Sequence, residues 1–251
     1  MTKCFFLFLS FFWFLWFDNA IYGKTIHAIL VADTIHEIQH VTQPDLYRWQ
    51  SEVRLIATHS KMSLKEKIFA GQEFNKEKIK GYLKHLKIEK DDSIIFYFSG
   101  HGYRTLSKKT PWPFLTFEYY KHGLDVQWVV NTIRSKQPQF SLVMSDCCNN
   151  FMENGMFGTE TKHVIVNLKE TAPEYSGYPQ LFNNAKGCVV ISSCSEGQFS
   201  YGSDLGGLYT QCFFASLKKE LKEKKPSWKR LLERANGLIG HIQRPICEVY
   251  R

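Results

Sequence analysis

The chain has 251 residues, of which 32 are Lys or Arg and 24 are Asp or Glu, so that its formal net charge is +8. Basic and acidic residues are interleaved, as in residues 216–225, and no aromatic-basic stripe accompanies them. The charge therefore indicates a solvated surface and excludes nucleic acid from the expected partners. The seven cysteines lack the paired Cys-x-x-Cys or Cys/His spacing of a zinc site, which argues against a structural metal. Whether any of them form disulfides stays open.

The first 23 residues are typical of a targeting segment. Lys3 precedes an apolar run over residues 4–17 that is too short to span a bilayer comfortably. We predict a secretory signal peptide over residues 1–23 and therefore export to the extracellular space or the periplasm. An uncleaved membrane anchor is the alternative, and it is the only membrane contact expected. Residues 24–251 can bury one sizeable core and are expected to form one domain.

Short apolar runs rich in β-branched and aromatic residues punctuate the remainder of the chain. Continuous runs of this kind are typical of strands that helices cover on both faces of a parallel sheet. The runs are Thr25–Ala32, Ser93–Phe98, Phe140–Ser145 and Cys188–Ser192, with a weaker one at Lys65–Gly71.

Helical patterns alternate with these runs. Apolar residues recur at helical spacing in residues 79–86, 126–133 and 208–217, a further helix is indicated from Pro226 and Ser227, and a final strand is expected in residues 245–250. Strands that alternate with helices predict an α/β fold, a doubly wound and mostly parallel sheet flanked by helices.

Residues between Asn149 and Lys186 have weak periodicity and are expected to form a long, mostly irregular connection. It would divide the domain into a large part of about residues 24–150, a connection of about 151–186 and a small part of about 187–251. Long connections are often functional or cleavable, so we predict self-cleavage at Lys162, Lys169 or Lys186.

Residues with catalytic chemistry follow two of the predicted strands. His101 stands between two glycines just after the Ser93–Phe98 run, and the adjacent Cys147 and Cys148 follow the Phe140–Ser145 run. In an open α/β sheet, ligands bind outside the carboxyl ends of the strands, which places both groups at the expected edge. A cysteine at the end of an apolar run is usually a small buried hydrophobe, but an imidazole at the same edge favours a nucleophile.

The stretches "FYFSGHG" (residues 96–102) and "SDCCNN" (residues 145–150) resemble the caspase-like peptidases, and among them the metacaspases and bacterial caspase-family proteins. His101 lies 47 residues before Cys148, which also resembles the spacing in caspases. The resemblance runs from about Lys24 to about Leu221. It implies a caspase-like fold and a cysteine endopeptidase acting on a peptide or protein.

The resemblance also assigns roles. The nucleophile of the metacaspase pattern is the cysteine two residues after the aspartate, so Cys148 is the expected nucleophile, His101 the proton carrier and Cys147 a core thiol. Alternation along the strand end agrees, because Asp146 and Cys148 would point to one side and Cys147 to the other. The backbone N–H groups of Gly102 and Cys148 would form the oxyanion hole. No third residue that orients the imidazole is identified.

Substrate preference follows from the same resemblance. Caspases that cleave after Asp use arginines, whereas residues 191–207 here contain no Arg or Lys. Metacaspases select Arg or Lys with acidic residues, whose counterparts here are Asp146, Ser99 and Asp45, with Asp33 as the second choice to Asp45. Asp45 is also a candidate for the start of a helix. We predict cleavage after basic residues.

Two features depart from the metacaspase pattern. In the metacaspase pattern His-Ser-Gly usually follows the cysteine, whereas this chain has Asn149 and Asn150 there. The acidic pairs that bind calcium in that family have no clear counterpart in this sequence. We therefore expect no cofactor and do not carry calcium dependence over. The alternatives are a catalytically inactive caspase-like module that binds a peptide or protein, a thiol-dependent hydrolase of esters or small amides, and an unrelated envelope-associated structural protein. The oligomeric state stays open.

Overall fold

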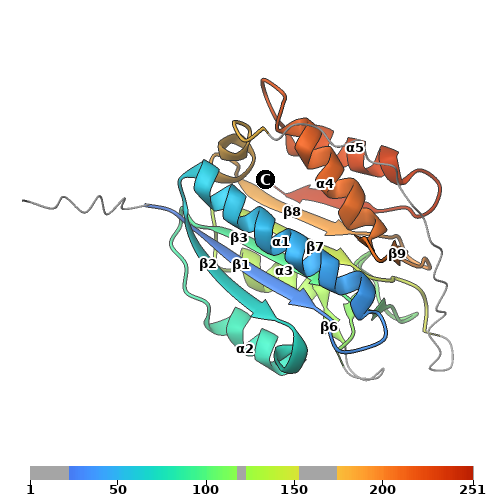
Figure 1. Cartoon of the computed structure of the whole chain (residues 1–251). Helices are drawn as coiled ribbons and strands as arrows, with labels where there is room; N and C mark the ends of the chain where they lie inside the picture. The colour runs from blue at the N-terminus through green and yellow to red at the C-terminus, as the bar shows by residue number, and fades with distance from the viewer. Residues whose placement is uncertain (1–22, 118–122, 153–173, 251) are drawn as a thin grey trace, which may run out of the picture.

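The computed structural model describes residues 23–117, 123–152 and 174–250 (Figure 1). Residues 1–22 of the predicted signal segment, as well as Lys162 and Lys169, lie outside these ranges. No helix within them is long and apolar enough to cross a membrane.

Six strands form one sheet in the order β11-β8-β7-β3-β1-β2. Neighbouring strands are parallel, except that β11 runs antiparallel to β8. The predicted α/β fold with a mostly parallel sheet is confirmed, and the weaker run forms a strand that begins two residues earlier than predicted. The strands are β1 (Thr25–Ala32), β2 (Ser63–Phe69), β3 (Ser93–Ser99), β7 (Phe140–Asp146), β8 (Gly187–Ser192) and β11 (Ile246–Tyr250).

Helices cover both faces of this sheet (Figure 1). Alternate strand residues supply the two cores: Leu30 of β1 faces the core of one side, and Val31 faces the core of the other. Trp49 lies at the centre of the first core and stacks on Phe213 with ring centroids 5.6 Å apart. The first face carries α1 (Gln39–Ser60), α4 (Leu208–Glu220) and α5 (Trp228–Ile239), and the second carries α2 (Lys76–His85) and α3 (Val126–Arg134).

Shorter elements lie in the connections between the strands of this sheet. A three-stranded antiparallel sheet follows β3, and a two-stranded hairpin precedes α4. The short elements are η1 (Gly71–Glu73), β4 (Gly102–Tyr103), β5 (Phe114–Leu115), β6 (Leu124–Asp125), η2 (Pro179–Asn183), β9 (Gly202–Ser203) and β10 (Gly206–Gly207). The described end of the connection is therefore partly helical, since η2 packs Leu181 and Phe182 into the core.

Helix α1 begins earlier than Asp45, which sequence analysis had considered as a helix start. The N–H groups of Val41 and Thr42 both donate to the carbonyl of Ile38, at 2.9 and 3.1 Å, and so open the helix before Pro44. Asp45 therefore lies inside α1, on its buried side.

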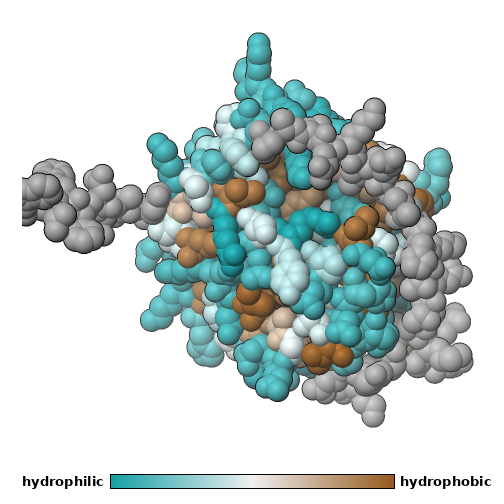
Figure 2. Space-filling model, in the orientation of Figure 1, coloured by the Kyte–Doolittle hydropathy of each residue, from teal (hydrophilic) through white to brown (hydrophobic). Residues whose placement is uncertain are grey.

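The surface agrees with the interleaved charges of the sequence. Figure 2 shows that the face over α1, α4 and α5 is largely hydrophilic, with apolar residues scattered over it. The lysines at the end of α4 and in the turn after it are exposed, namely Lys218, Lys219, Lys222, Lys224 and Lys225.

Helices α4 and α5 are joined by a buried carboxylate, that of Glu220. It is fully buried and accepts from Arg230 Nη2 at 2.6 Å and Nε at 3.0 Å, while Arg234 Nη1 lies at 3.2 Å. We predict that Glu220→Ala lowers the free energy of unfolding by about 3 kcal/mol, because it leaves two guanidinium groups without their buried partner. Urea unfolding measures this change. Glu223→Ala is the control and should cost much less, since Glu223 is partly exposed and its pair with Arg234 is screened by solvent. Equal losses in the two variants would contradict the assignment.

Candidate active site

The strand register brings the predicted site residues to one edge of the sheet. Ala32 pairs with Ser99 and Ser99 pairs with Asp146, so the carboxyl ends of β1, β3 and β7 form one row. His101 and Cys148 each follow this row by two residues, and the N–H of Gly100 donates to the carbonyl of Asp146 at 3.4 Å. The two segments that carry the imidazole and the thiol therefore leave the sheet together.

Gly102 lies against the side chain of Cys147 and the backbone carbonyl of Cys148. A Cβ atom at Gly102 would stand 2.5 Å from Cys147 Sγ and 2.5 Å from the carbonyl oxygen of Cys148. Only glycine lets β4 pass this close to the cysteine backbone. This contact places the two predicted oxyanion donors, Gly102 and Cys148, on adjoining segments.

The two cysteines occupy different surroundings. Cys147 is 2% exposed and packs in the core under α2 and α3. Cys148 is half-buried, and its Sγ accepts the N–H of Ser200 at 3.4 Å. Burial raises the pKa of Cys147 well above its ordinary value and raises the pKa of Cys148 to about 11. Cys148 is thus the more accessible thiol, and it needs a base before it can act as a thiolate.

His101 has an acidic neighbour that sequence analysis missed. Its Nε2 lies 3.1 Å from Oε1 of Glu37, a residue in the segment between β1 and α1. No sequence motif marks Glu37, since the contact depends on how this segment folds back over the end of β3.

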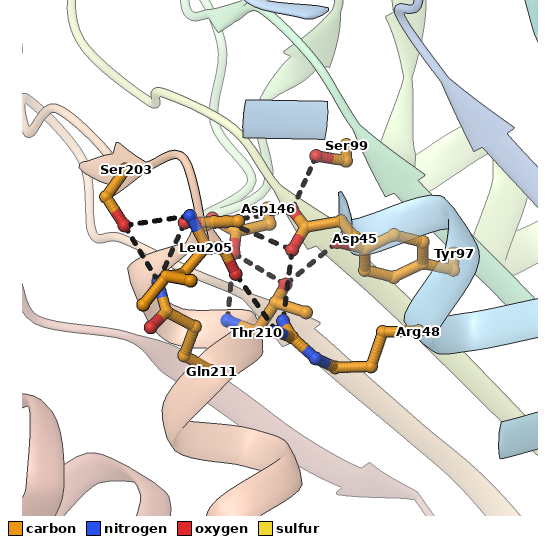
Figure 3. Close-up of polar contacts among 11 residues, drawn as sticks. Asp45, Arg48, Tyr97, Ser99, Asp146, Ser203, Leu205, Thr210 and Gln211 are labelled. Atoms are coloured by element: carbon orange, nitrogen blue, oxygen red, sulfur yellow. Dashed lines mark hydrogen bonds and ion pairs between the residues drawn. The ribbon is translucent and has the colours of Figure 1, made fainter. Parts of the chain in front are cut away.

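An acidic cluster lies at the end of β7, the strand that precedes the two cysteines (Figure 3). Asp45 is completely buried, accepts Ser99 Oγ at 2.9 Å and accepts the N–H of Gly207 on both oxygens at 3.0 Å. Nη1 of Arg48 lies 3.7 Å from Asp45 Oδ1. The structure therefore brings together the three residues predicted to line the pocket: Ser99, Asp45 and Asp146.

Asp146 points into the same cluster from β7. It accepts the N–H of Thr210 at 2.9 Å, Thr210 Oγ1 at 2.7 Å and Ser200 Oγ at 2.7 Å. Burial, and then the charge of Asp146, raise the pKa of Asp45 to about 7, although the hydrogen bonds from Gly207 and Ser99 and the charge of Arg48 oppose that shift. The pair therefore carries less than two full negative charges near neutral pH.

Asp33, the second choice for the acidic pocket, binds its own loop instead. Its carboxylate accepts Nδ1 of His36 at 2.7 Å and the backbone N–H of His36 at 3.2 Å. This short-range turn follows directly from the chemistry of an aspartate after a strand. The geometry therefore favours Asp45 over Asp33.

The hairpin before α4 covers the acidic cluster. A Cβ at Gly206 would stand 2.2 Å from Asp45 Oδ1, and one at Gly207 would stand 2.3 Å from Asp146 Oδ2. Gly206 also has a φ of +102°, which favours glycine. Arg48 Nη2 donates to the carbonyl of Leu205 at 3.0 Å and joins the hairpin to α1. A ligand side chain reaches the carboxylates only if this hairpin moves.

Asn149, where the sequence departs from the metacaspase pattern, braces the cysteine segment. The side chain of Arg104 is 1% exposed and donates to Asn149 Oδ1 at 3.1 Å and to the carbonyl of Thr110 at 2.9 Å. Nδ2 of Asn149 donates to the carbonyl of Pro111 at 2.8 Å. The amide thus ties the segment after Cys148 to the loop after β4.

Four site residues escaped sequence analysis: Glu37, Arg48, Ser200 and Thr210. Only Thr210 has a sequence signal, because it stands in the first turn of a predicted helix, where its N–H needs an acceptor. Within the described ranges, no group of three or more His, Cys, Asp or Glu side chains could hold a metal ion, and the cysteines there are all free thiols.

Comparisons with known proteins address the fold and the family. The family model for the caspase domain, peptidase family C14, matches residues 53–249, a stretch that contains His101 and Cys148 and begins after Asp45. Among solved structures, 211 chains match. One is the crystal structure of protein GSU0716 from Geobacter sulfurreducens, with a TM-score of 0.57 and 15% identity over 90% of this chain and 93% of that chain. The search of curated proteins found no match.

The close packing of Gly102 predicts a steric effect. Gly102→Ala should lower the free energy of unfolding by about 1–3 kcal/mol, because the added Cβ displaces the Cys147 side chain and the Cys148 carbonyl. Gly81→Ala in α2 is the matched control. A Cβ at Gly81 meets no atom within 4 Å, and alanine is favoured over glycine inside a helix, so this variant should not lose stability. Urea unfolding of both variants measures the change, and a Gly102→Ala chain as stable as Gly81→Ala would disprove the contact.

The raised pKa of Asp45 predicts pH-dependent stability. Its ordinary value is 3.8 and its value in the folded chain is about 7, so the folded chain holds a proton that the unfolded chain has lost between these limits. Stability from this group is complete below about pH 4 and falls by on the order of 1 kcal/mol per pH unit up to about pH 7. Asp45→Asn should remove this dependence.

Urea unfolding of wild type and Asp45→Asn at about pH 5 and about pH 8 measures the effect. The stability of wild type relative to the variant should fall between the two values, whereas Asp204→Asn, at an exposed position of the same hairpin, should track the wild type. A wild-type advantage that is equal at both pH values would show that Asp45 is ionised throughout.

Proposed function

The chain belongs to the caspase-domain peptidases, and we propose on this premise that it is a cysteine endopeptidase with Cys148 and His101 as its catalytic pair. His101 accepts the thiol proton, and Cys148 Sγ bonds to the carbonyl carbon of the scissile peptide. The N–H groups of Gly102 and Cys148 bind the oxyanion, and the imidazolium returns the proton to the leaving amine. Water then releases the acyl group from sulfur.

We propose cleavage after Arg or Lys. The observation that supports it is the buried cluster of Asp45, Asp146 and Ser99 beside the nucleophile strand. Buried carboxylates need a positive partner, and the guanidinium of Arg48 already lies 3.7 Å from Asp45. A substrate with a basic side chain supplies the same chemistry. A substrate aspartate would place a third carboxylate beside the pair.

The closed hairpin gives the substrate a second role. A basic side chain would have to displace residues 206–207 from the carboxylates, and its charge would favour the ionised form of Asp45. Occupation of the pocket and ionisation of Asp45 are therefore linked, so the preference for basic substrates should increase as the pH rises through about 7.

An inactive module that binds a peptide or protein is the second candidate. Two observations favour it: glycine backbone covers the acidic cluster, and burial raises the pKa of the Cys148 thiol to about 11. Such a module would bind a basic segment through the same carboxylates without forming a thiolate.

Export and processing complete the proposal. We propose that residues 1–23 are a signal peptide, which leads to secretion or to membrane anchorage. We also propose that the chain cleaves itself within residues 151–186. Lys186 is exposed just before β8, so a protease could reach it. The large part (24–150) and the small part (187–251) would stay together after cleavage, because β8 pairs with β7 in the same sheet.

Matched fluorogenic peptides ending in Arg, Lys or Asp test the function under reducing conditions, with and without calcium. We expect cleavage of the basic peptides, a loss of at least about 100-fold in Cys148→Ala and retained activity in Cys147→Ala. Cleavage of the Asp peptide in preference to the Arg peptide would refute the specificity. No cleavage of any peptide would favour the binding module.

A further inference from the structure

The segment between β1 and α1 places a carboxylate against the catalytic imidazole. Oε1 of Glu37 lies 3.1 Å from Nε2 of His101, within hydrogen-bond distance. The His101 side chain is 18% exposed and that of Glu37 is 56% exposed, so the contact sits at the rim of the site. The proposed mechanism gives this carboxylate no role.

The backbone holds Glu37 in this place. The N–H of Asp33 donates to the carbonyl of Ser99 at 3.0 Å, which ties the start of the segment to the strand end two residues before His101. The far end of the segment is fixed by Thr42, whose N–H donates to the carbonyl of Ile38 at 3.1 Å and whose Oγ1 donates to the carbonyl of Asp33. Glu37 is therefore carried by a loop anchored on both sides.

Two imidazole groups act on the Glu37 carboxylate: His101 through a hydrogen bond and its charge, and His36 through its charge. The ring of His36 also contacts Asp33, since its Nδ1 lies 2.7 Å from Asp33 Oδ1. A hydrogen bond from a backbone N–H has the largest effect on the pKa of Glu37 and lowers it. Partial burial raises the pKa by less, and the hydrogen bond and charge of His101 and the charge of His36 lower it further. The carboxylate is thus ionised near neutral pH.

We propose that Glu37 is a positioning residue that binds Nε2–H of His101, so that Nδ1 exchanges protons with the Cys148 thiol and the leaving amine. This inference rests on the proposed function. A histidine whose Nε2 carries a proton has a lone pair on Nδ1, which accepts the proton of Cys148 Sγ as the S–C bond forms. The resulting imidazolium lies against a carboxylate that stabilises its charge until Nδ1–H passes to the amine.

Peptide hydrolysis by the full-length chain tests the assignment. Glu37→Gln keeps the size of the side chain but removes its charge, so kcat should fall about 10- to 100-fold while KM changes less than about twofold. The pH profile of kcat should also change, because a neutral amide does not stabilise the imidazolium that forms during the reaction as a carboxylate does. Glu37→Asp should recover part of kcat. Glu73→Gln removes another exposed carboxylate that pairs with a cation, Lys78, and should match the wild type.

Alkylation by iodoacetamide gives a readout that does not need a peptide substrate. Mass spectrometry follows the labelling rate of Cys148 against pH, and Cys148→Ala identifies the label. Glu37→Gln should slow the labelling near neutral pH at unchanged thermal stability. If Glu37→Gln slows labelling but no peptide is cleaved, the proposed function fails and the positioning role stands. Glu37→Gln and wild type with equal kcat, pH profile and labelling rate would overturn the inference.

Discussion

Two carboxylates from distant parts of the chain bind the amino end of α4. Asp45 of α1 accepts the N–H of Gly207, and Asp146 of β7 accepts the N–H of Thr210. No side chain of the helix itself caps that end. The carboxylates therefore satisfy orphan donors of α4, and the positive end of the helix dipole favours their charge. This interaction aligns α1, β7 and α4 around the edge of the sheet where Cys148 lies.

The same two carboxylates lie close together in a buried place, which disfavours their ionisation and is consistent with a pocket for a basic group. Asp45 is buried beside Asp146, so burial and like charge raise its pKa to about 7, while Arg48 supplies only a distant partner at 3.7 Å. A stable core would replace such a pair by apolar residues. Two carboxylates under a glycine hairpin are consistent with a basic group from outside that completes their pairing, and this chemistry links the fold to the proposed specificity.

Around Cys148, buried polar groups hold the surrounding segments together through hydrogen bonds. Arg104 and Asn149 join the segment after Cys148 to the loop after β4. Gly102 lets β4 pass close to the Cys147 side chain and the Cys148 carbonyl. The Asn149 departure from the metacaspase pattern is therefore compensated by a local amide network. Glu37 adds the equivalent contact on the side of the imidazole, from a loop that the end of β1 anchors.

The α/β fold, the strands and the family could be predicted from local patterns in the chain, namely continuous apolar runs and the two strand-end motifs around His101 and Cys148. The family match confirms that resemblance. Strand alternation also separated Cys147 from Asp146, since successive side chains leave a strand on opposite sides. Local patterns could not predict that Asp45 rather than Asp33 lies beside Asp146, that Arg48 and the glycine hairpin cover this pair, or that Glu37 contacts His101. Such contacts join residues tens of positions apart through the register of the sheet and the course of its loops, and no spacing in the chain encodes that geometry.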